Sequence, residues 1–289
     1  MTPFRLVAAA IAALSLCGAV APQAAANDLG ARTNAPFLPT PHSTVETMLR
    51  MAGVGPGDIH YDLGSGDGRI SIAAVRDFGA ARSTGIDLDP ARVKEGIENA
   101  EKAGFSDRVR FVEGDVFEAD FSDATVVTMY LLQDLNLELR SRLLALRPGT
   151  RLVSYQFHLG DWQADAAVNP SRRAAPGGNV IEDDESLQVY LWTVPAPVAG
   201  RWEWEAEGEV FRLDLHQEFQ NVSGTLHAFG RETPIGNARL RGTALHIEAR
   251  VVRDGRTVPL RIEGTVSGDA IEGAVEIDGA RAALTARKL

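Results

Sequence analysis

The chain has 289 residues, a formal net charge of −10 at pH 7 and 45% hydrophobic residues. Its length exceeds the usual size of a single domain, and its apolar content is that of a globular protein with a full core. The acidic balance, without a basic patch or interleaved basic and aromatic residues, argues against a nucleic-acid partner. Cys17 is the only cysteine, so the chain cannot form an internal disulfide.

The N-terminus has the pattern of an export signal. Arg5 precedes an apolar run from Leu6 to Val20, and three alanines stand directly before Asn27. A positive start, an apolar middle and a small-residue exit are the three parts of a secretory signal peptide. The apolar run is shorter than the roughly 20 residues that a membrane span needs. We predict a signal peptide at residues 1–26 and a periplasmic or secreted protein. The alternative is an uncleaved N-terminal anchor that keeps the protein on the membrane.

Strands and helices alternate through the next part of the chain. Prolines at 36, 39 and 41 predict a loop over residues 27–43, after which Ser43 or Thr44 can cap a helix that ends near Ala52. The later segments are strand 59–63, helix 68–78, strand 83–87, helix 91–103, strands 109–113 and 125–130, helix 135–146 and strand 151–157. This alternation is typical of a doubly wound parallel sheet, in which ligands bind outside the carboxyl ends of the strands.

The rest of the chain has a different pattern of apolar and polar residues. Residues 158–185 predict a long loop, and residues 187–194 predict a strand at the edge of the first sheet. After Gly200, short runs of alternating apolar and polar residues predict a smaller antiparallel all-β domain, as a meander, a sandwich or a small closed sheet. We place the domains at residues 27–198 and 199–289. The histidines beyond residue 200 stand singly, so no metal site is expected.

The run from Asp62 to Ile70 joins the first strand to the first helix and is rich in glycine. Glycines in such a turn let the backbone bend tightly and leave room for a ligand, and the helix that follows offers free N–H groups. Asp87 ends the second strand about 20 residues after this loop, where a carboxylate can accept a hydrogen bond from a ribose hydroxyl. Together, the two features predict a nucleoside-containing cofactor.

Details of this loop distinguish between cofactors. A dinucleotide loop reads G-x-G-x-x-G and holds a pyrophosphate. Here the pattern is Asp-x-Gly-x-Gly-x-Gly, and a carboxylate before the first glycine repels phosphate but suits a cationic amino group. The pattern resembles motif I of the class I S-adenosylmethionine-dependent methyltransferases. Further segments resemble that family in order, namely residues 114–117, 124–130 and 147–155. The alternative is a glycine-rich turn of another α/β protein.

The resemblance implies a Rossmann-like doubly wound methyltransferase sheet with S-adenosyl-L-methionine as cofactor. It implies that Asp62 orients the amino group of the cofactor, that Asp87 binds the ribose and that Asp115 lies near the adenine. The implied cofactor-binding residues are Asp62, Gly64, Ser65, Gly66, Gly68, Asp87, Asp115 and Val116. Asp89 is expected to cap the helix that begins at Pro90 instead.

Two residues are candidates for the chemistry of methyl transfer. Tyr130 ends the fourth strand, whose end faces the transferred methyl in this family, although core packing would explain it equally well. His158 follows the fifth strand, where it could act as a base with Asp161 or simply line the loop.

Other segments resemble one branch of this family, which contains bacterial proteins and small membrane-anchored mitochondrial enzymes that methylate lysines of membrane proteins. These segments are residues 36–41, 45–49, 61–70, 85–90 and 161–165. The segment from Tyr130 to Gln133 departs from the mitochondrial enzymes, which leaves the methyl acceptor open. We expect methylation of lysine on a membrane-associated or periplasmic protein. The alternatives are a small-molecule methyl acceptor, or a non-catalytic module that binds the cofactor.

Overall fold

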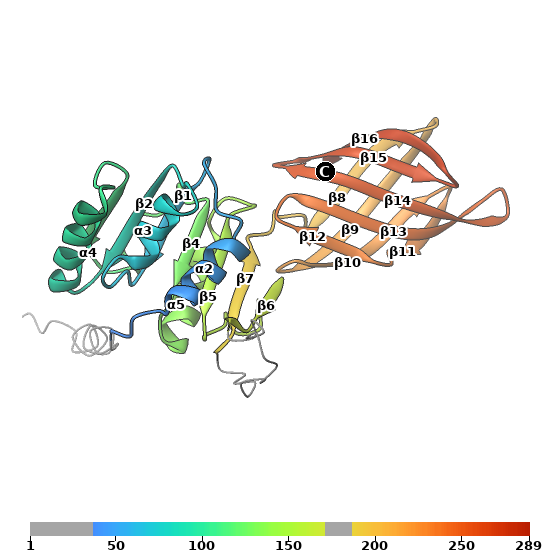
Figure 1. Cartoon of the computed structure of the whole chain (residues 1–289). Coiled ribbons are helices and arrows are strands. Elements are labelled where there is room, and N and C mark those ends of the chain that lie inside the picture. Colours follow the sequence, from blue (N-terminus) through green and yellow to red (C-terminus); the bar gives the residue numbers. More distant parts are fainter. Residues whose placement is uncertain (1–36, 171–186) are drawn as a thin grey trace, which may run out of the picture. The chain divides into compact units, whose positions relative to one another are not determined.

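A computed structural model describes residues 37–170 and 187–289 (Figure 1). The predicted signal peptide at residues 1–26 and much of the predicted loop after residue 158 lie outside the described residues. The described chain contains two sheets, one with mainly parallel strands and one entirely antiparallel, which confirms the predicted fold class. Contacts group residues 36–289 into one unit, so the domain boundary at residue 198 stays a prediction.

The first sheet has the strand order β3-β2-β1-β4-β5-β7-β6. Its strands are β1 Ile59–Leu63, β2 Arg82–Asp87, β3 Val109–Glu113, β4 Val126–Met129, β5 Arg151–Tyr155, β6 Ala166–Val168 and β7 Val189–Thr193. Strands β1 to β5 run parallel, whereas β7 pairs antiparallel with both β5 and β6. The strand order reverses between β1 and β4, and a crevice at such a switch point is where ligands bind in this type of sheet.

Helices cover both faces of this sheet (Figure 1). They are α2 His42–Met51, α3 Arg69–Arg76, α4 Pro90–Ala103 and α5 Gln133–Leu144. One buried core joins α2, α3 and α4 to one face of the sheet, through side chains such as Met48, Ile72 and Val126. A second core on the other face joins α5 to the sheet through Leu139 and Leu143. Alternate residues of each strand therefore face different sets of helices.

The helix starts show where the sequence prediction succeeds and where it fails. Asp89 accepts a hydrogen bond from the Ala91 N–H at 2.8 Å, and Pro90 occupies the first position of α4, so the predicted capping role of Asp89 is confirmed. The predicted Ser43 or Thr44 cap of α2 is wrong. That helix begins at His42 without a side-chain cap, because the Pro41 carbonyl already accepts hydrogen bonds from the first free N–H groups.

The edge of the first sheet also differs from the prediction. Strand β7 lies between β5 and β6, so β6 is the edge strand. Strand β6 has three residues, all exposed, and falls inside the segment predicted as a loop. Three small residues carry no periodicity that could be recognised in the sequence.

The second sheet is antiparallel throughout, in the order β11-β10-β9-β8-β16-β15-β14-β13-β12. Its strands are β8 Gly200–Ala206, β9 Glu209–Glu218, β10 Asn221–Ala228, β11 Arg231–Pro234, β12 Ala238–Arg241, β13 Ala244–Arg253, β14 Arg256–Ser267, β15 Ala270–Ile277 and β16 Ala280–Lys288. Its buried face centres on Trp202, Trp204 and Phe211. Pairs such as Asp254-Gly255 and Asp278-Gly279 have positive φ at both residues, which matches the twist of two-residue hairpin turns.

Among the residues described here, no helix combines the length and the apolarity needed to cross a bilayer.

Candidate functional site

The glycine-rich loop between β1 and α3 is held in an unusual backbone conformation. Gly64, Gly66 and Gly68 have φ values of 76°, 53° and 81°, in the left-handed region that favours glycine. The loop is tied to β2, since the N–H groups of Gly64 and Ser65 both donate to the Ile86 carbonyl. A Cβ atom on Gly66 would overlap the ring of Phe37. The loop therefore forms a cradle of bare backbone at the carboxyl end of β1.

Asp62 lies at the end of β1 and is 1% exposed. Its Oδ1 accepts a hydrogen bond from the Thr128 hydroxyl at 2.7 Å, whereas its Oδ2 has no hydrogen-bond partner. Burial raises the pKa of Asp62 to about 7; the Thr128 hydrogen bond opposes this shift, and the charges of Asp87 and Asp67 add to it. A buried carboxylate oxygen without a partner is costly in a folded protein, so this atom suits a cationic group supplied by a ligand.

Asp87, at the end of β2, also organises the loop. Its Oδ2 accepts the Gly66 N–H at 2.8 Å, and its Oδ1 accepts the Asp89 N–H at 3.0 Å. Each carboxylate oxygen has a second lone pair, so Asp87 can still accept hydrogen bonds from the hydroxyls of a ribose. The same residue thus connects the backbone of the cradle to the predicted ribose position.

Replacement of Asp87 by alanine is expected to weaken S-adenosylmethionine binding about 10- to 100-fold, since hydrogen bonds to a charged group contribute roughly 1.5–3 kcal/mol. Calorimetric titration of the folded variant measures the effect. Asp89→Ala is the matched control, because Asp89 is a neighbouring carboxylate that caps α4. It should lower stability by about 1 kcal/mol and leave the affinity within about twofold. Equal losses of affinity in both variants would contradict the assignment of Asp87.

Asp115 and Val116 follow β3, beside Asp87. The Gly114 N–H donates to the Asp87 carbonyl at 2.9 Å, so the ends of β2 and β3 are joined directly before Asp115. Asp115 accepts the Phe117 N–H at 2.8 Å, and Val116 is buried with its carbonyl bonded to Arg142. The structure thus brings the three predicted carboxylates to the ends of three neighbouring strands. Their individual contacts with the cofactor stay predictions.

Tyr130 directly follows β4 on the face covered by α2 and α3. Its hydroxyl donates to Gln156 Oε1 at 2.8 Å, and its ring centroid lies 4.8 Å from that of Tyr155 and 6.4 Å from that of Phe157. Burial raises the pKa of Tyr130, with the nearby Tyr155 adding to the shift, so the phenol keeps its proton at neutral pH. Gln156 has a φ of 66°, a rare conformation for a residue other than glycine and one often found at functional sites.

His158 is placed differently from Tyr130. Its Nδ1 accepts the Gly160 N–H at 2.9 Å, and its ring approaches Tyr190, which packs against the core on the opposite face of the sheet. A neutral imidazole whose Nδ1 accepts a hydrogen bond carries its proton on Nε2, so no ring nitrogen is left to act as a base. Asp161 forms an ion pair with Arg140 instead of His158. A catalytic role for His158 stays a prediction that this geometry does not favour.

Sequence reasoning missed the group formed by Tyr155, Gln156 and Phe157. The predicted strand 151–157 placed them inside the sheet, whereas β5 ends at Tyr155 and the next two residues turn away from it. Asn136 of α5 holds this turn, since its Nδ2 donates to the Ser154 hydroxyl and to the Phe157 carbonyl. Aromatic residues directly after a parallel strand are the signal that could have identified the group.

Buried polar atoms without partners gather around this edge of the sheet. They include Asp62 Oδ2, Ser65 Oγ and Asn136 Oδ1. Such atoms are rare in folded proteins and are usually satisfied by water or a ligand. Together with the glycine cradle, they fit a cofactor with a cationic amino group and a ribose.

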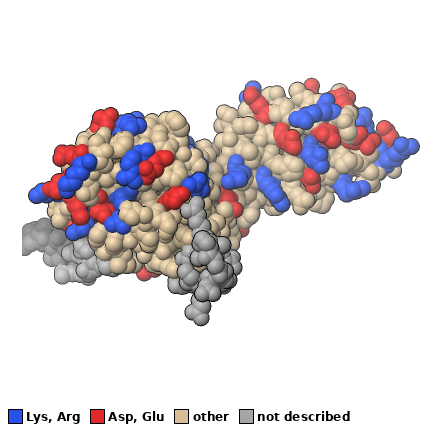
Figure 2. Space-filling model, in the orientation of Figure 1, with Lys and Arg blue, Asp and Glu red and all other residues tan. Residues whose placement is uncertain are grey.

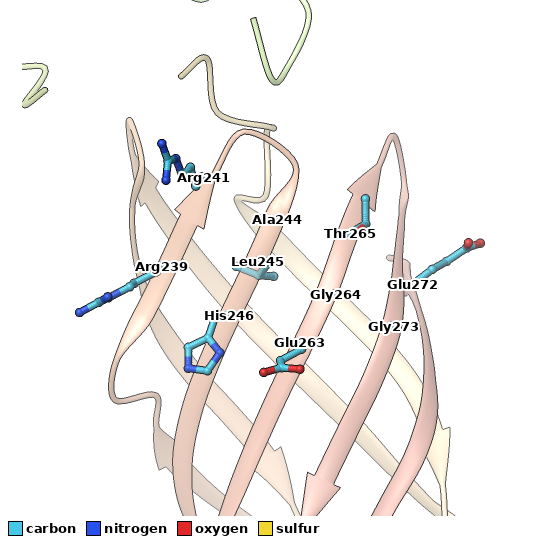
Figure 3. A pocket seen from close by; sticks show the side chains of 10 residues that line it. All are labelled: Arg239, Arg241, Ala244, Leu245, His246, Glu263, Gly264, Thr265, Glu272 and Gly273. Carbon is cyan, nitrogen blue, oxygen red and sulfur yellow. The ribbon is translucent and has the colours of Figure 1, made fainter. Parts of the chain in front are cut away.

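Two open hollows lie over strands of the second sheet. One of about 500 Å³ lies over β12 to β15, and Figure 3 shows its charged side chains spread over separate strands, without converging on one point. Gly264 and Gly273 are among the residues that line it. In the described parts of the chain, no three His, Cys, Asp or Glu residues lie close enough together to hold a metal ion. The candidate site is therefore the carboxyl edge of the first sheet.

Comparisons with known proteins match this part of the chain. The family model described as the ANTKMT methyltransferase domain matches residues 62–166. A protein-lysine N-methyltransferase of Saccharolobus islandicus is 45% identical over 160 residues, which make up 55% of this chain and 93% of that protein. The adenine nucleotide translocase lysine N-methyltransferase of Mus musculus is 33% identical over 138 residues, or 47% of this chain and 59% of the relative.

A solved structure of an RNA methyltransferase from Salinibacter ruber, in complex with S-adenosyl-L-homocysteine, is 46% identical and covers 56% of this chain and 96% of its own, with a TM-score of 0.49. The family match ends at residue 166, before the second sheet begins at Gly200. The chain spans nearly the whole Saccharolobus islandicus protein but little more than half of the mouse enzyme. The motif order, the cradle at the end of β1, the family model and the similarity to the Saccharolobus islandicus protein agree: the chain belongs to the class I S-adenosylmethionine-dependent methyltransferases.

Proposed function

We propose that this enzyme transfers a methyl group from S-adenosylmethionine to the side-chain amine of a lysine in a protein. The observation that carries the proposal is the arrangement of Tyr130, whose proton is donated to Gln156 and whose ring packs with Phe157. Relatives with protein-lysine methyltransferase names support the same acceptor. The cofactor supplies an electrophilic methyl group on a positively charged sulfur.

Tyr130 can orient the amine. Because its own proton is donated to Gln156, the phenolic oxygen has a lone pair available to accept an N–H from the incoming amine. A lysine ammonium must first lose a proton, after which its lone pair has to align with the methyl group. Fixing one N–H of the amine restricts the directions in which that lone pair can point.

Aromatic side chains at this position also suit a charged product. Methylated lysine carries a positive charge, and the faces of aromatic rings attract such a charge. Burying the charge against aromatic rings costs less desolvation free energy than burying it in an ion pair with a carboxylate. Tyr130 and Phe157 are half-buried, whereas Tyr155 is buried behind them. The first two rings can therefore contact a substrate side chain while the third holds Tyr130 in place.

The surface charge is consistent with a protein acceptor. Figure 2 shows Lys and Arg side chains interspersed with Asp and Glu over the visible face, and the chain as a whole carries a net charge of −10. Nucleic-acid binding sites need a positively charged track that neutralises phosphates. A small-molecule acceptor is the second candidate, because a relative named 27-O-demethylrifamycin SV methyltransferase is 27% identical over 224 residues.

Tyr130→Phe is expected to lower kcat about 100-fold, within the usual range for a group that positions a proton-transferring reactant. The affinity for cofactor should stay within about threefold, since Tyr130 is placed beside the acceptor and not beside the ribose or amino group. Tyr190→Phe is the matched control, a tyrosine of the same sheet that packs on the opposite face. Equal kcat losses in the two variants would contradict the proposed role.

The experiment that tests the acceptor uses cofactor with an isotopically labelled methyl group. The purified chain is incubated with membrane and periplasmic extracts, and labelled protein is hydrolysed to amino acids. We expect the label in methylated lysine. Label only in RNA or only in small molecules would contradict lysine methylation, and binding of cofactor without any transfer would favour the non-catalytic alternative.

We also propose that the enzyme acts outside the cytosol, on a periplasmic or membrane-associated protein. The support is the pattern of residues 1–26, with its positive start, apolar run and small-residue exit. Cell fractionation with N-terminal sequencing should find a mature chain that begins at Asn27 in the periplasm. A chain that still begins at Met1 in the membrane fraction would indicate an anchor, and a full-length cytosolic protein would contradict export.

A further inference from the structure

His60 is a fully buried histidine that has no role in the site described so far. It lies on β1, two residues before Asp62, and is 0% exposed. Its Nδ1 lies 2.8 Å from Ser83 Oγ on β2, and its Nε2 lies 2.9 Å from Thr128 Oγ1 on β4. Burial lowers the pKa of His60 to about 3, against the charge of Asp58. The ring is therefore neutral at physiological pH and carries a single N–H.

Thr128 connects this histidine to the cofactor site. Residues two apart on a strand share a face, so His60 and Asp62 both lie on the face covered by α2 and α3. Thr128 stands directly opposite Asp62 in the register of β1 and β4, and its hydroxyl donates to Asp62 Oδ1 at 2.7 Å. The same hydroxyl oxygen lies next to His60 Nε2. One hydroxyl thus joins the histidine to the carboxylate.

Counting hydrogens fixes the direction of this chain. An ionised Asp62 has no hydrogen to give, so the Thr128 hydroxyl must donate to it. The oxygen of Thr128 then accepts the N–H of His60, which places the ring proton on Nε2. The bare Nδ1 accepts the hydroxyl hydrogen of Ser83. Every hydrogen in the chain from Ser83 to Asp62 then has one position.

We propose that His60 is a positioning residue for the cofactor: as the Nε2–H tautomer it holds the Thr128 hydroxyl on Asp62 Oδ1, which leaves Asp62 Oδ2 for the amino group of S-adenosylmethionine. In this arrangement Asp62 Oδ2 is the oxygen that has no hydrogen-bond partner in the protein. The proposal concerns the cofactor alone and does not depend on the identity of the methyl acceptor.

When Asp62 gains a proton, that proton lies on Oδ1, because Thr128 can accept it there while Oδ2 has no partner, and the hydrogen-bond chain reverses. The protonated carboxyl then donates to Thr128, Thr128 donates to His60 Nε2, and the ring proton moves to Nδ1, facing Ser83. The Nε2–H tautomer therefore accompanies the ionised carboxylate that attracts a cationic amine. Loss of His60 removes the donor behind Thr128 and makes the ionised form of Asp62 less favourable.

The charges that act on this hydrogen-bond chain come from few elements. Asp87 of β2 and Asp67 of the glycine-rich loop act on Asp62, and Asp58 acts on His60. Asp67 is paired with Arg69 at the start of α3. The side chains that α2 and α3 bury against this face are uncharged, as are Val126 and Thr128 of β4, and Asp58 is paired with Arg151 of β5. Changes of the His60 tautomer and of ligand affinity with pH should therefore come from the titration of Asp62.

The first test measures the histidine tautomer in the full chain without cofactor. Histidine labelled with ¹⁵N distinguishes the two ring nitrogens by NMR, and the His60→Gln spectrum identifies the His60 signals among the six histidines. We expect the Nε2–H tautomer at pH 8.5 and a change to Nδ1–H as the pH falls through about 7. A ring that carries its proton on Nδ1 at pH 8.5, or that keeps one tautomer down to pH 5.5, would overturn the proposal.

The second test measures S-adenosylhomocysteine affinity by calorimetry between pH 6 and pH 9. His60→Leu removes the donor to Thr128, whereas His60→Gln keeps a side-chain N–H. Each affinity is divided by that of the unaltered chain at the same pH, which cancels titration of the ligand amine. We expect His60→Leu to bind about ninefold more weakly at pH 6, about fivefold more weakly at pH 7 and almost equally well at pH 9, as a shift of about one pKa unit in Asp62 implies. His60→Gln should stay within about threefold throughout.

Two buried serines provide the matched controls. Ser83 ends the hydrogen-bond chain, whereas Ser71 of α3 is equally buried but its hydroxyl has no partner. Ser83→Ala should give a smaller loss than His60→Leu with the same pH dependence, and Ser71→Ala should give none. A loss in His60→Leu that is constant from pH 6 to pH 9, or absent, would show that the histidine only fills space.

Discussion

Replacement of Asp62 by asparagine is expected to weaken S-adenosylmethionine binding at least about 100-fold, or roughly 3 kcal/mol. Asparagine keeps the shape of the side chain and removes the charge that attracts the amino group. The effect should be large because Asp62 is 1% exposed, so water cannot screen the interaction. Calorimetric titration with S-adenosylmethionine measures it. An affinity within tenfold of the unaltered chain would show that the carboxylate does not hold the cofactor.

The same substitution should stabilise the protein without cofactor at alkaline pH. The pKa of Asp62 is raised to about 7 in the fold, from 3.8 in the unfolded chain. Between these values the folded state holds a proton that the unfolded state has lost, so stability falls as the pH rises from about 4 to about 7. The full cost, a few kcal/mol, is present above pH 7.

Urea unfolding at pH 5 and pH 8 separates this effect from a general change in packing. Asparagine does not ionise, so Asp62→Asn should lose much less stability than the unaltered chain between the two pH values. The expected gap in the free energy of unfolding is small at pH 5 and larger at pH 8. An equal decline in both proteins would mean that Asp62 is not the group that titrates.

Replacement of Gly68 by alanine is expected to lower the free energy of unfolding by roughly 2–5 kcal/mol and to abolish cofactor binding. Gly68 has a φ of 81°, and a Cβ there would overlap the ring of Phe111 and lie 3.3 Å from the Gly96 backbone. Left-handed backbone costs a residue with a Cβ about 1–2 kcal/mol, and overpacking adds about 1–3 kcal/mol.

Gly104→Ala is the matched control for backbone strain. Gly104 has a φ of 77°, but a Cβ there would meet nothing within 4 Å. It should therefore cost only about 1–2 kcal/mol and leave cofactor affinity unchanged. Urea unfolding of the two variants gives the difference that belongs to the crowded loop. Equal destabilisation would contradict the close packing of the cradle.

Local patterns explain why much of the fold could be predicted. The parallel strands were recognised because they alternate with helical segments, and the glycines between Asp62 and Arg69 mark the turn after the first strand. The N-cap role of Asp89 could also be predicted, because Asp is favoured at the N-cap and Pro at the first position of a helix. The individual strands, the start of α4 and the glycine-rich turn could therefore be predicted from local sequence.

The polar chain behind Asp62 could not be predicted in the same way. His60 meets Ser83 and Thr128, which lie 23 and 68 residues away in sequence. Their contact depends on β1 lying between β2 and β4, and strand order is a property of the whole sheet. A histidine in an apolar strand is the visible signal, since a buried polar ring needs partners on both nitrogens.

The second sheet shows a similar limit. Alternation of apolar and polar residues predicted antiparallel strands after Gly200, but β11 and β16 carry too little of this pattern to be recognised. Strand β11 has four residues and none is buried, while β16 buries Leu284 and Ala286 within an alanine-rich run. Short or weakly apolar strands form because a neighbouring strand supplies backbone hydrogen bonds. Their own side chains show little preference for a strand.

A crystal structure of the chain with S-adenosylhomocysteine would decide whether Asp62 and Asp87 hold the cofactor. It should place the amino group of the ligand within hydrogen-bond distance of Asp62 Oδ2, the ribose hydroxyls on Asp87 and the sulfur toward Tyr130. A ligand that lies elsewhere, or that leaves Asp62 Oδ2 without a partner, would contradict the site.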